Sequence, residues 1–184
     1  PQTTPTKKPI SDPSQTAPSA ETAKGIARVI YAEKPSLGRK IAEALGATRR
    51  GNGFMSGAGK DGSAIYVTWG FGHMGGLVYP ETYDSRYKSW KARPCPFIPD
   101  QYRIAPLPDR GVSQQLDIVS DLFKPDNLVI CATDDDREGE LIFAYVCELV
   151  GYAGPYQRVR IDSLTVNGIR KAFSALIPGQ ERQS

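Results

Sequence analysis

Two short, continuous apolar segments constrain the fold of this chain more than any other feature. They are Arg28–Ala32 and Leu128–Ala132, and each is followed by polar residues and then by a stretch with helical spacing. Strands that are apolar along their whole length are typical of a parallel sheet whose two faces are both covered by helices. The sequence therefore predicts an α/β fold with a small, mainly parallel sheet of the doubly wound kind.

The remaining elements follow from hydrophobic spacing and from turn residues. Pro35 suits the first turn of a helix and Gly46 suits its end. The segment 78–109 is rich in proline and aromatic residues, which predicts a long ordered excursion across the surface. The other expected elements are strands at Phe54–Ser56, Ala64–Trp69 and Arg158–Ile161 and helices at Val112–Phe123, Glu138–Val150 and Val166–Ile177.

The chain of 184 residues is long enough for one domain with a tail. Residues 1–25 are rich in Pro, Thr and Ser and poor in large apolar side chains, so we expect a disordered tail or linker there. The domain is predicted over residues 26–178, and 179–184 form a C-terminal tail. Because the first residue is Pro1 rather than Met, the chain is interpreted as a piece of a longer protein.

Composition excludes several classes of protein. The 3 cysteines form no CxxC pair, which argues against a zinc knuckle or a redox dithiol and fits a reducing compartment. No apolar stretch approaches the roughly 20 residues that span a bilayer. We therefore expect a soluble protein of the cytoplasm with no membrane partner. The net charge of +3 leaves nucleic-acid binding open.

An acidic run follows the second apolar segment. Residues 134–140 read DDDREGE, so Asp134, Asp135, Asp136, Glu138 and Glu140 fall within one short stretch. Two like charges 4 Å apart repel by about 4 kcal/mol near a protein surface. A helix N-terminus offsets only about 0.3 to 1 kcal/mol per charge. A bound divalent cation would neutralise such a cluster.

The spacing of the run suggests which carboxylates share the ion. In extended backbone Asp134 and Asp136 point to the same side, with Glu138 next in line. Hard oxygen ligands without His or Cys favour Mg²⁺, and Mn²⁺ should substitute for it. The alternative interpretation is a solvated helix start that binds nothing.

Glu33 comes directly after the first apolar segment, much as the acidic run comes after the second. If the two strands are parallel neighbours, Glu33 and Asp134 leave the sheet at the same edge, where α/β proteins bind ligands. Glu33 could then contribute to the metal site and act as a general acid or base. Lys34 could neutralise a phosphate or a departing oxygen.

These residues resemble a known family. AEKPS at 32–36 and DDDREGE at 134–140 are similar to the motifs of the toprim domain of type IA DNA topoisomerases, in the form found in topoisomerase III. Further similarity lies in Gly72-His73, in the stretch 83–90 and in 158–173, so the resemblance spans about residues 26–177.

The resemblance implies a function and a role for each matching residue. In the family, a tyrosine cleaves single-stranded DNA through a 5′-phosphotyrosyl link, another strand passes, and the break is rejoined with Mg²⁺. It implies that Glu33 exchanges a proton with the 3′ oxygen and that Lys34 stabilises the scissile phosphate. Asp134, Asp136 and Glu138 would hold the metal, with Arg137 paired to a neighbouring carboxylate. The implied DNA contacts are His73, Arg86, Lys88, Trp90 and Arg137.

One part of the family's active site has no match here. None of the 9 tyrosines falls in a motif like that of the attacking tyrosine, which family members carry on a separate domain. We therefore expect that the isolated chain is inactive and that its partners are single-stranded DNA and the remaining topoisomerase domains. The alternatives left open are a toprim nuclease or primase-like phosphoryl transferase, and a stand-alone DNA-binding toprim module. The aromatic rings of 83–90 either stack on bases or hold their loop in place.

Overall fold

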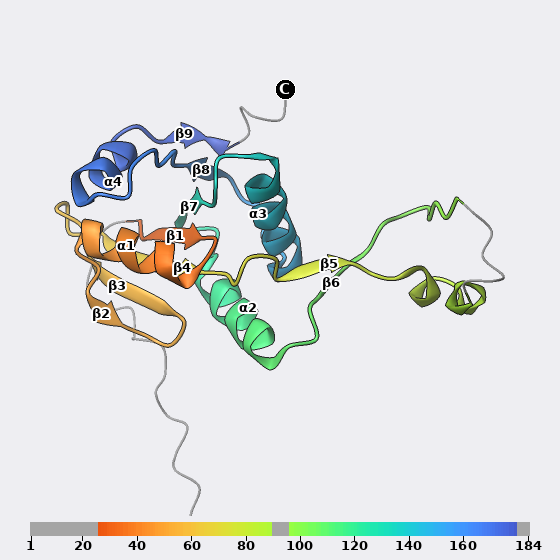
Figure 1. Cartoon of the computed structure of the whole chain (residues 1–184). Helices are drawn as coiled ribbons and strands as arrows, with labels where there is room; N and C mark the ends of the chain where they lie inside the picture. Colours follow the sequence, from red (N-terminus) through yellow and green to blue (C-terminus); the bar gives the residue numbers. More distant parts are fainter. Residues whose placement is uncertain (1–25, 90–95, 180–184) are drawn as a thin grey trace, which may run out of the picture.

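A mixed sheet forms the centre of the molecule in the computed structural model, which describes residues 26–89 and 96–179 (Figure 1). Its four central strands are parallel to one another, in the order β4 (Ala64–Trp69), β1 (Arg28–Ala32), β7 (Leu128–Ala132) and β8 (Tyr156–Arg158). Antiparallel strands flank them: β2 (Arg49–Arg50) and β3 (Phe54–Ala58) beside β4, and β9 (Ile177–Pro178) beside β8.

Helices cover both faces of this sheet. One face carries α1 (Pro35–Leu45) and α4 (Val166–Phe173), and the other carries α2 (Arg110–Leu122) and α3 (Arg137–Val150). Alternate residues of β1 are buried under each layer: Ile30 faces α1 and α4, and Tyr31 faces α2 and α3. Because helices cover both faces of the central strands and exclude water from them, these strands are apolar along their length. The predicted α/β architecture is confirmed.

Local sequence explains how α1 is placed. Pro35 occupies the first turn, and Gly46 ends the helix in the left-handed conformation at φ 77°. Within the helix, a Cβ added to Gly38 would lie 2.6 Å from the ring of Trp69 in β4. The absence of a side chain at this position therefore lets α1 pack closely on the sheet.

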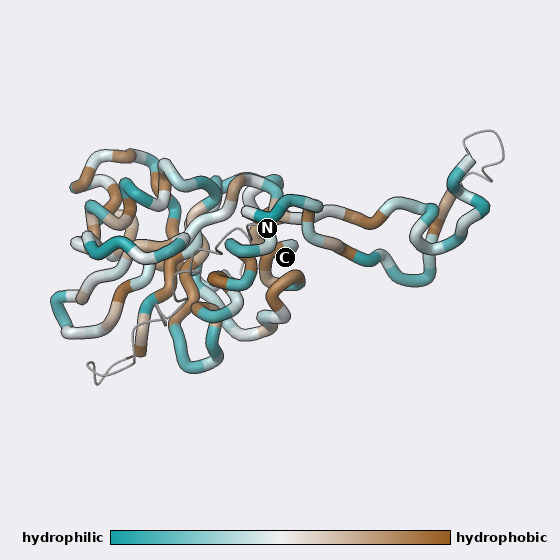
Figure 2. Tube along the Cα trace, turned by 90° about the horizontal axis from the view of Figure 1, so that it is seen from below, coloured by the Kyte–Doolittle hydropathy of each residue, from teal (hydrophilic) through white to brown (hydrophobic). Residues whose placement is uncertain are grey.

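The segment between β4 and α2 leaves the body as an arm, defined here as residues 75–89 and 96–106. It begins and ends in the two-stranded ribbon of β5 (Gly75–Leu77) and β6 (Ile104–Pro106) and carries the short 3₁₀ helices Pro80–Thr82 and Ser85–Lys88. Figures 1 and 2 show the arm projecting away from the rest of the molecule. The predicted course across the surface is therefore wrong.

The aromatic residues of the arm explain this difference. The rings of Tyr83 and Tyr87 pack on Phe97 with centroids 5.3 and 4.6 Å apart, and the guanidinium of Arg103 lies over Tyr83. These rings form a small cluster of their own at the tip instead of packing on the core of the domain. Of the two interpretations of the rings, the one in which they hold their own loop in place applies to Tyr83 and Tyr87.

Two expectations near the C-terminus need correction. The last parallel strand spans Tyr156–Arg158 rather than Arg158–Ile161. The final helix ends at Phe173, because the N–H groups of Ser174 and Ala175 turn back to the carbonyls of Lys171 and Ala172. The chain then returns along β8 as β9. Residues 1–25 and most of the predicted tail at 179–184 lie outside the described residues, so those boundaries stay predictions.

Candidate functional site

The loops after β1 and β7 meet at the carboxyl edge of the sheet. The two strands are parallel with Ala32 paired to Ala132, so the chain leaves both at the same level. The backbone N–H of Asp134 donates to Oε2 of Glu33 at 3.4 Å. The expected meeting of Glu33 with the acidic run is therefore confirmed for Asp134.

Glu33 is the more enclosed of the two catalytic candidates. Its side chain is 14% exposed, and its Oε1 lies 3.4 Å from Nζ of Lys34, which is 53% exposed. One oxygen of the carboxylate thus faces the ammonium of Lys34 and the other faces the backbone N–H of Asp134. A carboxylate and an ammonium therefore lie side by side at this edge, a pair of groups that can in principle exchange a proton and offset negative charge.

A glycine turn after β4 brings His73 to the same edge. The N–H groups of Gly70 and Gly72 donate to the carbonyls of Ala32 and Glu33 at 2.9 and 3.0 Å. Gly72 has a φ of 78°, which suits glycine, and a Cβ at Gly70 would collide with the hydroxyl of Tyr31. The imidazole Nε2 of His73 then lies 3.3 Å from Oε1 of Glu138.

Each carboxylate of the acidic run has a different environment. Oδ1 of Asp136 accepts the N–H of Gly139 at 2.7 Å and caps α3, so this part of the run does begin a helix. Asp135 pairs with Arg160 at 3.3 Å, and Glu140 pairs with Arg158 at 2.6 Å. The helix cap and the two ion pairs thus stabilise three of the carboxylates, so the bound cation that was expected is not the only group that can offset their mutual repulsion.

Asp134 is the carboxylate that stays at the rim. Its side chain is exposed and forms no ion pair with any residue of the described ranges. Gly139 explains its placement, because a Cβ there would collide with the carbonyl of Asp134. The first turn of α3 therefore packs directly on the backbone of Asp134, and this aims the loop toward Glu33.

The donor set suits a hard divalent cation held by few protein ligands. Within the described ranges, no three His, Cys, Asp or Glu side chains stand close enough to hold a metal ion by themselves. Mg²⁺ keeps several waters and is usually bound by one or two carboxylates together with substrate phosphate. The carboxylates of Glu33 and Asp134 fit that mode of binding.

The candidate DNA contacts do not all gather at this edge. His73 does, whereas Arg86 and Lys88 lie on the arm and Trp90 lies outside the described residues. Arg86 hydrogen-bonds Asp84 and holds the pKa of that carboxyl below its usual range. Arg137 is exposed and forms no ion pair with another described residue, so its expected carboxylate partner is not found there.

A different arginine, from outside the acidic run, pairs with a carboxylate of the run, and the sequence did not point to it. Arg158 in β8 has a side chain 1% exposed and forms the ion pair with Glu140. A charged residue placed in a strand just before the apolar Val159 was the available signal. Its partner could not be read from the sequence, since β8 and α3 come together only in the folded chain.

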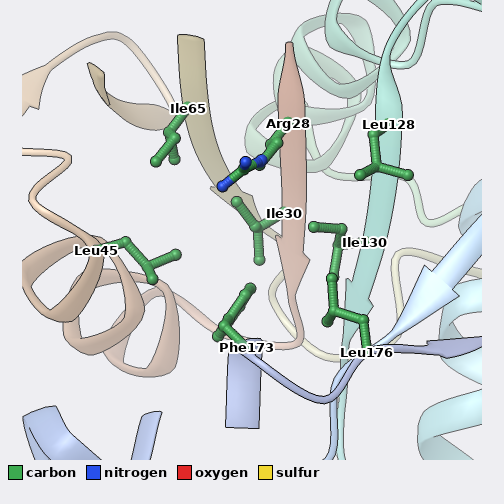
Figure 3. A pocket seen from close by; sticks show the side chains of 8 residues that line it. All are labelled: Arg28, Ile30, Leu45, Ile65, Leu128, Ile130, Phe173 and Leu176. Carbon is green, nitrogen blue, oxygen red and sulfur yellow. The ribbon is translucent and has the colours of Figure 1, made fainter. Parts of the chain in front are cut away.

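A cavity of about 260 Å³ lies elsewhere, at the opposite ends of the strands. Figure 3 shows the apolar side chains that line it, with the guanidinium of Arg28 among them. None of the candidate site residues lines it. The lining residues are Arg28, Ile30, Leu45, Ile65, Leu128, Ile130, Phe173 and Leu176.

The fold and this edge define the class of protein. Residues 28–164 match the family model of the Toprim domain, and the chain belongs to this family. It is 37% identical over 153 residues to the DNA topoisomerase 3 of Bacillus cereus and 34% identical over 157 residues to that of Bacillus subtilis. These matches cover 83% and 85% of this chain, which spans about a fifth (20% and 21%) of the length of these relatives.

A solved structure supports the fold. The chain is similar to full-length topoisomerase I from Thermotoga maritima with a TM-score of 0.51 and 19% identity, over 79% of this chain and 20% of that one. Among the described residues, no helix is long and apolar enough to cross a membrane.

Proposed function

We propose that this chain is the toprim part of a type IA topoisomerase III-like enzyme, which cleaves and rejoins single-stranded DNA to change DNA topology. The observation that carries the proposal is the meeting of Glu33, Lys34 and Asp134 at one edge of the sheet. The partners in this proposal are single-stranded DNA and the remaining topoisomerase domains, one of which brings the tyrosine. The compartment is the cytoplasm.

In this reaction the tyrosine hydroxyl releases its proton to solvent and attacks a phosphodiester, the bond from phosphorus to the 3′ oxygen breaks, and a 5′-phosphotyrosyl link forms; rejoining reverses each of these changes. Glu33 donates a proton to the departing 3′ oxygen and takes it back when that oxygen attacks the link during rejoining. Lys34, beside it, offsets negative charge on the phosphate. No nucleotide or water is consumed, so the DNA strand is restored.

The carboxylates of the edge would hold Mg²⁺, which Mn²⁺ would replace. Asp134 and Glu33 are the first candidates, Asp136 offers the oxygen that does not cap α3, and Glu138, which contacts His73, is a further candidate. When bound, Mg²⁺ would supply positive charge to offset that of the phosphate during rejoining. In this proposal His73, in the turn after β4, and Arg137, exposed in the first turn of α3, contact the DNA backbone.

Two experiments test the proposal. The first incubates the 184-residue chain with Mg²⁺ and labelled single-stranded DNA. We expect binding without cleavage and without relaxation of supercoiled plasmid. Mg²⁺-dependent hydrolysis to free ends would instead support a nuclease, and polymerisation of added ribonucleotides would support a primase.

The second experiment places residues 28–164 in the Bacillus cereus DNA topoisomerase 3 in exchange for its matching segment. We expect the chimera to relax negatively supercoiled plasmid and to leave a covalent protein–DNA adduct when stopped with detergent. Glu33→Ala in the chimera should abolish relaxation. A chimera that unfolds at the same temperature as its parent but forms no adduct would contradict the proposal and favour a non-catalytic module.

A further inference from the structure

Arg158 is a charged side chain in the dry interior of the domain. Its side chain is 1% exposed, although it lies in a strand whose neighbouring residues are partly exposed. A buried guanidinium is strongly unfavourable unless its donors are satisfied and its charge is paired. The contacts of Arg158 therefore indicate what it is retained to do.

Those contacts converge on the loop that follows β7. Nη1 donates to the carbonyl of Thr133 at 3.1 Å and lies 3.5 Å from that of Asp134. Nη2 donates to Oγ1 of Thr133 and to Sγ of Cys131, each at 3.2 Å. Nε lies 2.6 Å from Oε1 of Glu140 in α3. One guanidinium thus touches the strand, the loop and the helix.

Thr133 extends this link to the start of α3. Its hydroxyl accepts from Arg158 and donates to the carbonyl of Gly139 at 2.8 Å. The same turn of α3 packs on the backbone of Asp134 and is capped by Asp136. The loop backbone at Thr133 and Asp134 is therefore held both by Arg158 and by the first turn of α3.

We infer that Arg158 is a positioning residue: it fixes the backbone of Thr133 and Asp134 so that the Asp134 carboxylate stays at the rim beside Glu33. Glu140 acts as the counter-ion of Arg158 and is not a ligand of the metal. The part of this inference that concerns metal rests on the proposed function. The part that concerns the loop does not, because the contacts between Arg158 and the loop are present without any bound ligand.

Lysine cannot replace this arginine. A guanidinium presents five N–H donors in a rigid plane, whereas an ammonium is a single point with three donors. Arg158→Lys keeps the charge for Glu140 but cannot reach both carbonyls, the thiol and the hydroxyl together. The matched control is Arg160→Lys, because Arg160 also pairs with a carboxylate of the run but its side chain is 51% exposed.

The first test measures amide hydrogen exchange by NMR on the metal-free chain. In Arg158→Lys we expect the amides of Asp134 and Gly139 to exchange at least about tenfold faster, with those of β1 and β4 unchanged. Arg160→Lys should leave all of them as in the wild type. Should Arg158→Lys fail to fold, Thr133→Val tests the same link with Arg158 in place, and the same local increase is expected.

The second test measures Mg²⁺ affinity by calorimetry. If Asp134→Asn shows that the wild-type chain binds Mg²⁺ through Asp134, Arg158→Lys should weaken binding roughly 10–100-fold, as loss of a residue that orients ligands commonly does. Glu140→Gln should lower stability but leave binding through Asp134 in place.

The outcomes separate the two proposals. Unchanged exchange at Asp134 and Gly139, or an equal increase over the whole sheet, would overturn the positioning role. So would wild-type Mg²⁺ affinity in a folded Arg158→Lys chain. A wild-type chain without Asp134-dependent Mg²⁺ binding would count against the proposed function, while the exchange experiment would still decide the role of Arg158.

Discussion

The N–H of Asp134 and the carboxylate of Glu33 lie 3.4 Å apart although 101 positions separate the two residues in the chain. Parallel pairing of β1 with β7 creates this contact, because both strands end at the same level. The site is thus a product of strand order.

The two aspartates at the ends of the β7 loop should respond differently to mutation. Asp134→Asn should weaken Mg²⁺ binding with little loss of thermal stability, since its side chain is exposed and supports no other described group. Asp136→Ala removes the cap of α3 and should also cost about 0.5–2 kcal/mol of stability. Asp136→Asn keeps a capping oxygen and is the matched control. Calorimetry and thermal unfolding measure the two effects, and equal stability of the Ala and Asn variants would contradict the capping role.

Gly139 should not tolerate a side chain. A Cβ at this position collides with the carbonyl of Asp134, so Gly139→Ala must displace the loop or the helix and should cost about 1–3 kcal/mol. Gly76→Ala is the control, because a Cβ there meets nothing within 4 Å. Urea unfolding of both variants checks this. A Gly139→Ala chain as stable as the wild type would show that the contact is not rigid.

The arm should loosen independently of the domain. Phe97→Ala removes the ring on which Tyr83 and Tyr87 pack, so the N–H of Arg103, which donates to the Tyr83 hydroxyl, should exchange faster. The temperature of unfolding should hardly change, since the tip contributes nothing to the two core clusters. Ile98→Ala, at a side chain 73% exposed, should change neither quantity. A large fall in unfolding temperature for Phe97→Ala would mean that the arm packs on the body.

Stability should fall at alkaline pH because of two thiols. Burial raises the pKa of Cys131, and burial also raises the pKa of Cys147 to about 12. Above about pH 9 the unfolded chain releases these protons while the folded chain keeps them, so the free energy of unfolding falls as pH rises. Each thiol contributes roughly 1.4 kcal/mol per pH unit at most.

Urea unfolding between pH 8 and 10.5 measures this slope. In Cys147→Ala the free energy of unfolding should fall less steeply with pH, because one of the two thiols no longer contributes. A slope that is identical in the variant would assign the alkaline loss to other groups. Burial also raises the pKa of the fully buried Tyr31, which adds to the fall in the same direction at higher pH.

Much of the fold follows from local sequence. The continuous apolar strands, the Pro35 start and Gly46 end of α1, and the motifs around Glu33 and Asp134 were sufficient to predict a toprim-like α/β domain, and the family match confirms it. The course of the arm could not be predicted in this way, because the spacing of its aromatic residues does not indicate whether their rings pack on the core or on each other.

The sequence by itself determined which segments become buried strands and helices and which acidic residues follow the strands, because these depend on hydrophobic pattern and turn chemistry within a few residues. Only the tertiary structure decided how the five carboxylates divide their tasks, with Asp136 capping α3, Glu140 paired to buried Arg158, and Asp134 left beside Glu33. The physical reason is that capping, burial and charge pairing across the sheet depend on neighbours that are distant in the chain, and no local pattern encodes which of them meet.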